Sequence, residues 1–218
     1  MSNAVTYDAA RRRIIGLVIA GDPGAAVDAC PGWTVKDVVA HLAGGLGDFA
    51  NRNLDGVDTG EWGERQVRDR RSRTLGEVFA EWERNFQVAE GLFDSPAGAV
   101  LIAEVVEHEH DIRTALGRPG DRRGVSVRAA LTRPLQEVDQ RLRARQLPAL
   151  RVVLEHGDRI LGEGEPTATL RTSAFELLRV VGGRRSESQI RSLDWDADPT
   201  RWLAALQLFG TRDTALVE

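Results

Sequence analysis

The stretch from Glu104 to Asp111, which reads EVVEHEHD, decides how this chain is interpreted. Glu104 and His108 are four residues apart, so on a helix their side chains point the same way. A carboxylate and an imidazole in that arrangement are suited to holding a metal ion. His41, far upstream, would complete a set of two histidines and one carboxylate, which leaves one coordination position open for chemistry.

The helical projection of this stretch predicts which of its polar side chains face inward. His108 lies on the apolar side of the helix, with Glu104 and Asp111 at the edge of that side. His110 projects about 160° away from His108 around the helix axis, so we expect it on the surface. Burying a carboxylate with an imidazole costs several kcal/mol unless the two groups are paired or bind a metal.

Two interpretations of the inward polar groups remain open from spacing alone. In the first, His41, Glu104 and His108 share a metal ion. In the second, Glu104 simply accepts a hydrogen bond from His108 or His41, because structural networks also bury ionisable groups. The single Cys30 has no histidine near it in the sequence, and we interpret it as a core or loop residue rather than a nucleophile.

Composition narrows the class of protein. The chain has 218 residues, enough for a full core and two modest domains, and a net charge of −4, which argues against nucleic-acid binding. Cys30 cannot form an internal disulfide, which favours a reducing compartment, so we expect a cytoplasmic protein. No apolar stretch approaches the roughly 20 residues that span a bilayer, so we expect no membrane association.

Helix starts are well marked in the first two thirds of the chain. Thr34 with Asp37 and Thr74 with Glu77 have capping-box spacing, and Ser95-Pro96 is typical of a first turn. These signals predict helices over 35–46, from 74 onward and over 96–117, and a further helix is expected over 127–143. The polar, glycine-containing segment 51–73 is expected to be a long loop or a partly ordered excursion over the surface.

After Pro148 the pattern changes to an alternating one. It predicts strands over 150–155, 168–171 and 189–195, with turns at Gly157 and Gly162, and helices over 173–181 and 199–209. His156 falls in the first turn. We therefore predict a mainly α protein with a helical bundle over residues 1–147 and a small α+β domain over 148–218.

Two segments resemble the signatures of a known family. The stretch 30–42, CPGWTVKDVVAHL, and the stretch 104–117, with its Glu-x-x-x-His, resemble the DinB-like, mycothiol-dependent maleylpyruvate isomerase superfamily. The part from Phe175 to Trp195 looks like the sterol-carrier-protein-like domain of many members. The resemblance implies a DinB-like four-helix bundle with His41, Glu104 and His108 as metal ligands. Asp111 is expected beside these ligands, in their outer shell.

The same resemblance implies a function. A divalent metal would favour the thiolate of mycothiol, the co-substrate, in an isomerase or S-transferase that acts on a small electrophile. Zinc suits two histidines and a glutamate best, while nickel and ferrous iron stay open. Arg113, Arg184 and Arg185 are candidates to bind a substrate carboxylate. Neither the substrate nor a homodimeric state is decided by the sequence.

Two further interpretations compete with an enzyme. A non-catalytic, metal-dependent ligand-binding or stress-response protein would be favoured by a closed site in which Asp111 supplies a fourth ligand. An open position at the floor of a pocket would favour catalysis instead. A metal-free, purely structural bundle is the third interpretation.

Overall fold

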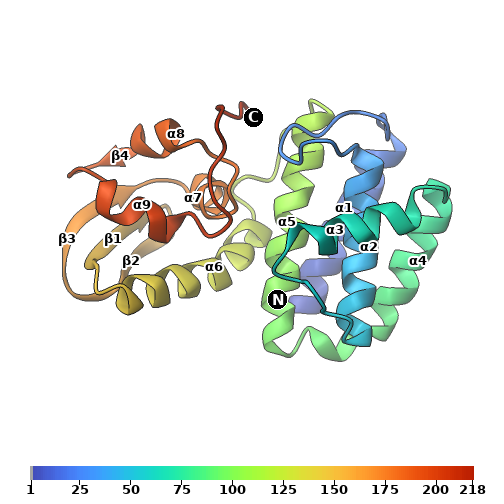
Figure 1. The fold of residues 1–218 in the computed structure, drawn as a ribbon, viewed down its shortest axis with the longest axis horizontal. Helices are drawn as coiled ribbons and strands as arrows, with labels where there is room; N and C mark the ends of the chain where they lie inside the picture. The colour runs from blue at the N-terminus through green and yellow to red at the C-terminus, as the bar shows by residue number, and fades with distance from the viewer. Residues whose placement is uncertain (1) are drawn as a thin grey trace. The chain divides into compact units, whose positions relative to one another are not determined.

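The computed structural model describes residues 2–218, which divide into two compact units. Unit 1 extends to Gly120 and unit 2 is Asp121–Glu218. Unit 1 is helical, whereas unit 2 combines a sheet with helices (Figure 1). The predicted fold class, a helical bundle followed by a small α+β domain, is confirmed.

Unit 1 is built around four long helices that pack side by side (Figure 1). Helix α1 packs on α5, α2 packs on both α4 and α5, and a shorter helix α3 lies against α2. Ile14, Leu42, Leu46, Trp82 and Leu101 are all fully buried between these helices. The helices of unit 1 are α1 (Asn3–Ile19), α2 (Val35–Asn51), α3 (Gly60–Arg70), α4 (Leu75–Val88), the 3-10 turn η1 (Glu90–Leu92) and α5 (Pro96–Ala115).

The helix starts follow the predicted capping signals. Thr34 and Thr74 each accept a hydrogen bond from the third backbone N–H of their helix, and the capping box is complete at both. Ser95 caps α5 with Pro96 in its first turn. Because these caps satisfy backbone groups that the helix itself leaves unpaired, they fix where α2 and α5 begin. The helix starts in turn set the direction in which the candidate ligands of α2 and α5 point.

A secondary-structure prediction for unit 1 is corrected by the structure. Segment 51–73 was expected to be a loop or a partly ordered excursion, but it contains α3. Trp62, Gln66 and Val67 form the buried side of this helix and are 6% exposed or less. Glycines and charged residues fill the remaining positions, so this amphipathic helix contains few apolar residues.

Unit 2 is a four-stranded sheet with helices against it. The strands are ordered β2-β1-β3-β4, with β1 antiparallel to β2 and parallel to β3. Leu150, Val152 and Leu170 of the sheet and Leu177 of α7 are fully buried. The elements are α6 (Val125–Ala144), β1 (Pro148–Leu154), β2 (Gly157–Leu161), β3 (Glu163–Arg171), α7 (Ala174–Val181), α8 (Glu187–Arg191), β4 (Asp194–Trp195) and α9 (Thr200–Leu206).

The sequence signals in unit 2 are confirmed in part. The expected strands over 150–155 and 168–171 and the helix over 173–181 correspond to β1, β3 and α7, and His156 lies in the predicted turn. The turn expected at Gly157 lies at Glu155 and His156, and Gly157–Leu161 is a strand because it pairs with β1 despite its polar residues. The segment expected as one strand over 189–195 is divided between α8 and β4, since Ser186 caps a helix there.

The domain boundary stays a prediction. It was placed at residue 147, which would keep α6 with the helical bundle, whereas α6 contacts α7, α9 and β2 of unit 2. Pro134 lies inside α6 and is buried without ending the helix. The compact unit therefore begins at Asp121, ahead of the linker-like Pro148 that marked the change of periodicity.

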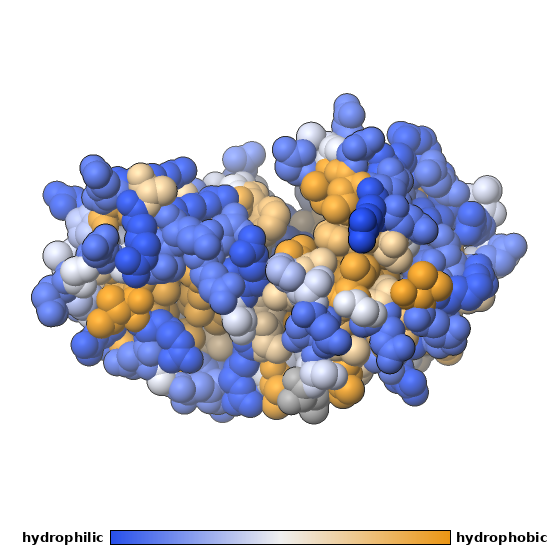
Figure 2. Space-filling view, turned by 90° about the horizontal axis from the view of Figure 1, so that it is seen from below, coloured by the Kyte–Doolittle hydropathy of each residue, from blue (hydrophilic) through white to orange (hydrophobic). Residues whose placement is uncertain are grey.

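Hydrophilic residues cover most of the visible surface of each unit, with apolar residues in small groups between them (Figure 2). Large apolar side chains that are more than half exposed, such as Ile19, Val88 and Phe209, are far apart in the sequence. In the part of the chain that is described, no helix combines the length and the hydropathy that crossing a membrane requires.

Candidate metal centre

Two of the three predicted ligands are in direct contact. The Nε2 atom of His41 on α2 lies 3.0 Å from Oε1 of Glu104 on α5, and the two side chains are 8% and 19% exposed. Two ligand atoms bound to one tetrahedral zinc ion would be roughly 3.3 Å apart, given bonds of about 2 Å. The contact of α2 with α5 therefore brings these two atoms together at a separation that suits a shared metal.

The third predicted ligand stands beside this pair. The ring of His108, one turn after Glu104 on α5, is 5.1 Å from the ring of His41 between centroids, at an interplanar angle of 80°. His108 is 8% exposed. The helical spacing of Glu104 and His108 thus puts a second imidazole on the same side as the carboxylate, as the sequence predicts.

Both histidines have a partner at Nδ1. The Nδ1 atom of His41 lies 2.6 Å from Oε1 of Gln66, and Nδ1 of His108 lies 3.0 Å from Oδ2 of Asp111. An amide or carboxylate oxygen can only accept there, so each Nδ1 carries a proton, and Nε2 is the ring nitrogen that would bind a metal. Histidines that bind metals are held in this way, with the outer ring N–H donated to an oxygen.

Gln66 is a site residue that the sequence analysis missed. It lies on α3, is 2% exposed, and donates from Nε2 to Oδ2 of Asp48 at 3.0 Å. Arg65 in turn contacts the same Asp48 oxygen at 3.3 Å. The chain of contacts from Arg65 to His41 fixes which end of the Gln66 amide faces the imidazole. The burial of Gln66 beside Trp62 and Val67 would have been the signal, had α3 been recognised.

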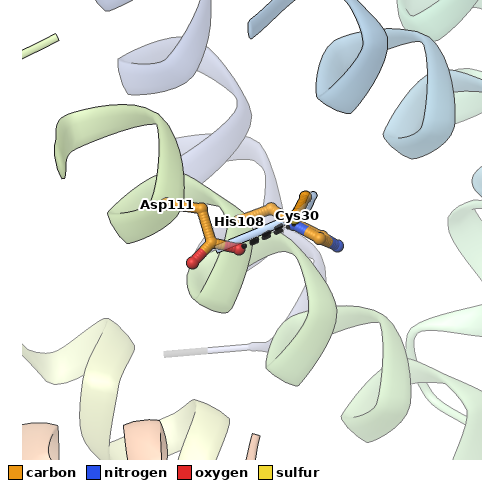
Figure 3. A group of neighbouring side chains, drawn as sticks. All are labelled: Cys30, His108 and Asp111. Atoms are coloured by element: carbon orange, nitrogen blue, oxygen red, sulfur yellow. Dashed lines mark hydrogen bonds and ion pairs between the residues drawn. The ribbon is translucent and has the colours of Figure 1, made fainter. Parts of the chain in front are cut away.

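Cys30 lies in a loop and is half-buried, and the fold gives it a histidine neighbour that is distant in the sequence. Its Sγ atom lies 3.8 Å from Nδ1 of His108 and 3.7 Å from Oδ2 of Asp111. Figure 3 shows these side chains together, with His108 and Asp111 on α5 and Cys30 on the segment before α2. Their ligand atoms lie within 4.8 Å of one another. Two candidate ligand sets therefore share His108.

The expectation that His110 is a surface residue is wrong. His110 is 3% exposed, and every residue of α5 from Val105 to Ile112 is buried. The projection assumed one inward side, but α5 is enclosed around its circumference at this level. Glu109, 1% exposed, makes ion pairs with Arg13 at 2.7 Å and Arg113 at 2.8 Å.

Aromatic side chains enclose the His41 ring. Trp33, just before α2, lies 5.1 Å from it between centroids, and Trp62 of α3 lies 5.9 Å away in an edge-on arrangement. Tyr7 of α1 accepts a hydrogen bond from Trp82 of α4 at 2.9 Å. Burial raises the pKa of Tyr7 far above its ordinary value, and the Glu104 carboxylate adds to that rise against the hydrogen bond from Trp82. Tyr7 therefore stays a neutral phenol.

The predicted substrate arginines are engaged within their own units. Arg113 pairs with Glu109 on α5. Arg184 donates to the carbonyl oxygen of Gly182, and Arg185 pairs with Glu176 and with Glu218. A role for any of the three in substrate binding stays a prediction.

The donor set fits a divalent metal. His41, Glu104 and His108 offer two imidazole Nε2 atoms and one carboxylate, which are ligands that zinc, nickel and ferrous iron accept. With Nδ1 of both rings held by oxygen acceptors, the outer shell that such a site needs is present.

Comparisons with known proteins identify a family and similar folds. Residues 7–145 match the family model described as the mycothiol maleylpyruvate isomerase N-terminal domain. The fold is similar to a crystal structure of the mycothiol-dependent maleylpyruvate isomerase, with a TM-score of 0.57 and 12% identity. A histidine-to-alanine mutant of that enzyme gives a TM-score of 0.60, also at 12% identity. Each match covers 90% of this chain and 92% of the other. No curated protein matches the sequence.

Proposed function

Since the chain belongs to the mycothiol maleylpyruvate isomerase family, we propose that it is a metal-dependent enzyme that uses mycothiol on a small electrophile. The reaction is an isomerisation or an S-transfer. The observation that carries this proposal is the 3.0 Å contact of His41 with Glu104, beside His108 on the same turn of α5. Three protein ligands leave a divalent ion one position for a thiol or water, which is the arrangement of catalytic rather than structural sites.

The residues of unit 1 have defined roles in this proposal. His41, Glu104 and His108 would hold the metal, and Gln66 and Asp111 would orient the two imidazoles. A bound divalent ion would lower the pKa of the mycothiol thiol, so that thiolate is available at neutral pH. Trp33 and Trp62 enclose His41 and limit the access of water to the ligands.

The chemistry is the same for both reaction types up to the adduct. The mycothiol thiolate forms a carbon–sulfur bond to an activated double bond, and the electron pair moves onto the neighbouring electron-withdrawing group. In an isomerase, rotation about the resulting single bond precedes return of the electron pair and departure of the same thiolate. In an S-transferase, protonation of the adduct gives the product. Neither course needs a protein nucleophile. The one cysteine of the chain, Cys30, adjoins the proposed ligand His108 and takes no part in either course.

Elemental analysis of the purified chain tests the first part. We expect about one divalent ion per chain, with zinc as the first choice. Alanine variants of His41, Glu104 and His108 should each lose most of it. Full metal content in all three variants would refute this ligand set.

Activity screening tests the second part. The chain, with and without mycothiol, is assayed against activated alkenes, including cis-configured dicarboxylates, and against alkyl halides. We expect turnover that needs both metal and mycothiol. Absence of any metal-dependent turnover or thiol binding would favour the non-catalytic interpretation.

The second candidate function is a non-catalytic, metal-dependent binding or stress-response protein. The group of Cys30, His108 and Asp111 favours it, because a thiolate and a carboxylate added to histidine approach the ligand sets of closed structural sites. In that case the metal would be held through Nδ1 of His108, and Cys30 would be indispensable for binding.

A further inference from the structure

Unit 2 contains a cavity of about 710 Å³. It lies between α6 and the β1–β2 hairpin, with Ala174 at the start of α7 also on its wall. This volume is within the range of roughly 300–1,000 Å³ that small-molecule sites occupy. All of its lining residues belong to unit 2, and none of them is a proposed metal ligand or a predicted substrate arginine.

Part of the wall is apolar. Leu131 and Leu135 of α6 face the cavity together with Leu154 of β1 and Leu161 of β2. Leu131 and Leu161 are buried, with 2% and 5% of their surface exposed. A hydrocarbon chain or an aromatic ring that replaced water against these four leucines would gain hydrophobic contact from both the helix and the sheet.

The same cavity has two arginines on its wall, Arg128 and Arg159. Arg128 donates to Nε2 of His156 at 3.1 Å, and Arg159 donates to the carbonyl oxygen of Asp158 at 2.9 Å. Neither guanidinium pairs with a carboxylate anywhere in residues 2–218. A guanidinium has five N–H donors in a planar fork, so most donors of both side chains are available to an anion.

Asp139, the acidic residue of the wall, does not cancel this charge. Its carboxylate accepts from Nε of Arg143 at 2.9 Å and from the backbone N–H of Gly162 at 2.7 Å. The hydrogen bond from Arg143 holds the pKa of Asp139 below its ordinary value, so the group is ionised and paired. The two arginines consequently leave the cavity with an excess of positive charge.

We propose that this cavity binds a small organic anion with an apolar body, whose carboxylate pairs with Arg128 and Arg159. The apolar body would lie against Leu131, Leu135 and the leucines of the hairpin. Such a ligand satisfies both halves of the wall, whereas an inorganic anion uses only the arginines. This binding site does not depend on the proposed metal centre and is tested without metal or mycothiol.

Titration of octanoate into the full chain, followed by calorimetry and by NMR shifts of unit 2, tests the proposal. We expect saturable binding at one site. Arg128→Ala or Arg159→Ala should weaken it about tenfold or more, since each removes a charge-assisted contact. Arg145→Ala is the matched control, because Arg145 is exposed at the end of α6 and outside the cavity, and it should leave affinity unchanged.

Two further measurements separate the parts of the proposal. Gln136→Trp, at an exposed position of the wall, should block binding by filling the cavity while unit 2 keeps its melting temperature. 1-Octanol should bind at least about tenfold more weakly than octanoate, because it lacks the charge. Absence of saturable binding, equal affinity for octanol, or binding that ignores both arginine variants would overturn the proposal.

Discussion

In unit 1 the largely buried carboxylates of Glu104 and Asp111 lie against imidazole rings, whereas in unit 2 the buried carboxylate of Glu218 lies between two guanidinium groups. Arg179 and Arg185 reach Glu218 at 2.6 and 2.8 Å. An arginine is always charged, so the cluster in unit 2 is neutralised by the protein itself.

This difference indicates what each cluster is for. Imidazoles are neutral over much of the physiological range and can offer a lone pair, which a guanidinium never can. Carboxylates beside imidazoles therefore make a set of ligands that a divalent cation completes, while carboxylates between arginines make a closed structural network. The comparison predicts that changes in unit 1 affect metal binding and changes in unit 2 affect stability.

The largest effect is expected from His108→Ala. This change removes one of the proposed ligands, and metal affinity should fall by more than the roughly 100-fold that loss of an outer partner causes at most. Mycothiol-dependent turnover should be lost with the metal. Metal content by elemental analysis and affinity by competition with a chelator measure the outcome.

His110→Ala is the matched control for His108→Ala. Both histidines are buried on α5, at 8% and 3% exposure, and the ring of His108 lies beside that of His41. The His110 variant should keep its metal and lose only stability, since it leaves a cavity. Loss of metal from this variant alone would mean that the wrong histidine of α5 has been assigned.

Glu218→Gln should give the next largest effect, on stability. The change removes the side-chain charge that the fully buried Arg179 contacts at 2.6 Å, at a cost of about 3 to 5 kcal/mol. Metal content should not change. Urea unfolding of the variant and the parent chain measures the difference, and an unchanged midpoint would show that the network contributes nothing to stability.

The pH dependence of unit 2 follows from the same network. Burial alone would raise the pKa of Glu218, but Arg179 and Arg185 outweigh it and hold that pKa below its ordinary value. The stabilisation is thus present above the ordinary glutamate pKa of about 4.3 and is lost as pH falls through the lower folded value. In Glu218→Gln this component of acid unfolding should disappear.

A smaller effect is expected from Gln66→Ala. The variant removes the acceptor that holds Nδ1 of His41, so metal affinity should fall about 10-fold to 100-fold with the ligands intact. Gln87→Ala is the control, because Gln87 is an exposed glutamine whose side chain donates to Glu83 on α4. Equal affinities in the two variants would remove Gln66 from the outer shell.

Much of unit 1 was predictable because its signals are local. Within each capping box, at Thr34 and at Thr74, the two partners are three residues apart. The spacing of Glu104 and His108 directly gives their common side of α5. His41 was assigned by its resemblance to a family signature, and its contact with Glu104 agrees with that assignment.

The rest depends on long-range packing that a helical projection does not contain. Cys30 meets His108 across 78 positions of sequence, and Gln66 meets His41 across 25. The burial of His110 likewise depends on what surrounds α5, not on its own periodicity. In unit 2, β2 was missed because a polar edge strand is specified by pairing with β1 rather than by alternation.

The smallest effect is expected from Cys30→Ser, which decides between the two ligand sets that share His108. A serine hydroxyl can donate to Asp111 as the thiol does, so the contact that steadies Asp111 beside His108 is kept. If His41, Glu104 and His108 hold the metal, affinity should change by no more than a few-fold, and mycothiol-dependent turnover should persist. If Cys30, His108 and Asp111 hold it, the serine variant should lose the metal, since a neutral hydroxyl replaces a thiolate. Cobalt substitution of the parent chain gives an independent answer, because a thiolate ligand adds a charge-transfer band that histidine and carboxylate ligands lack. Retained metal without that band would assign the site to the two histidines and the glutamate and leave Cys30 as a neighbour of the site.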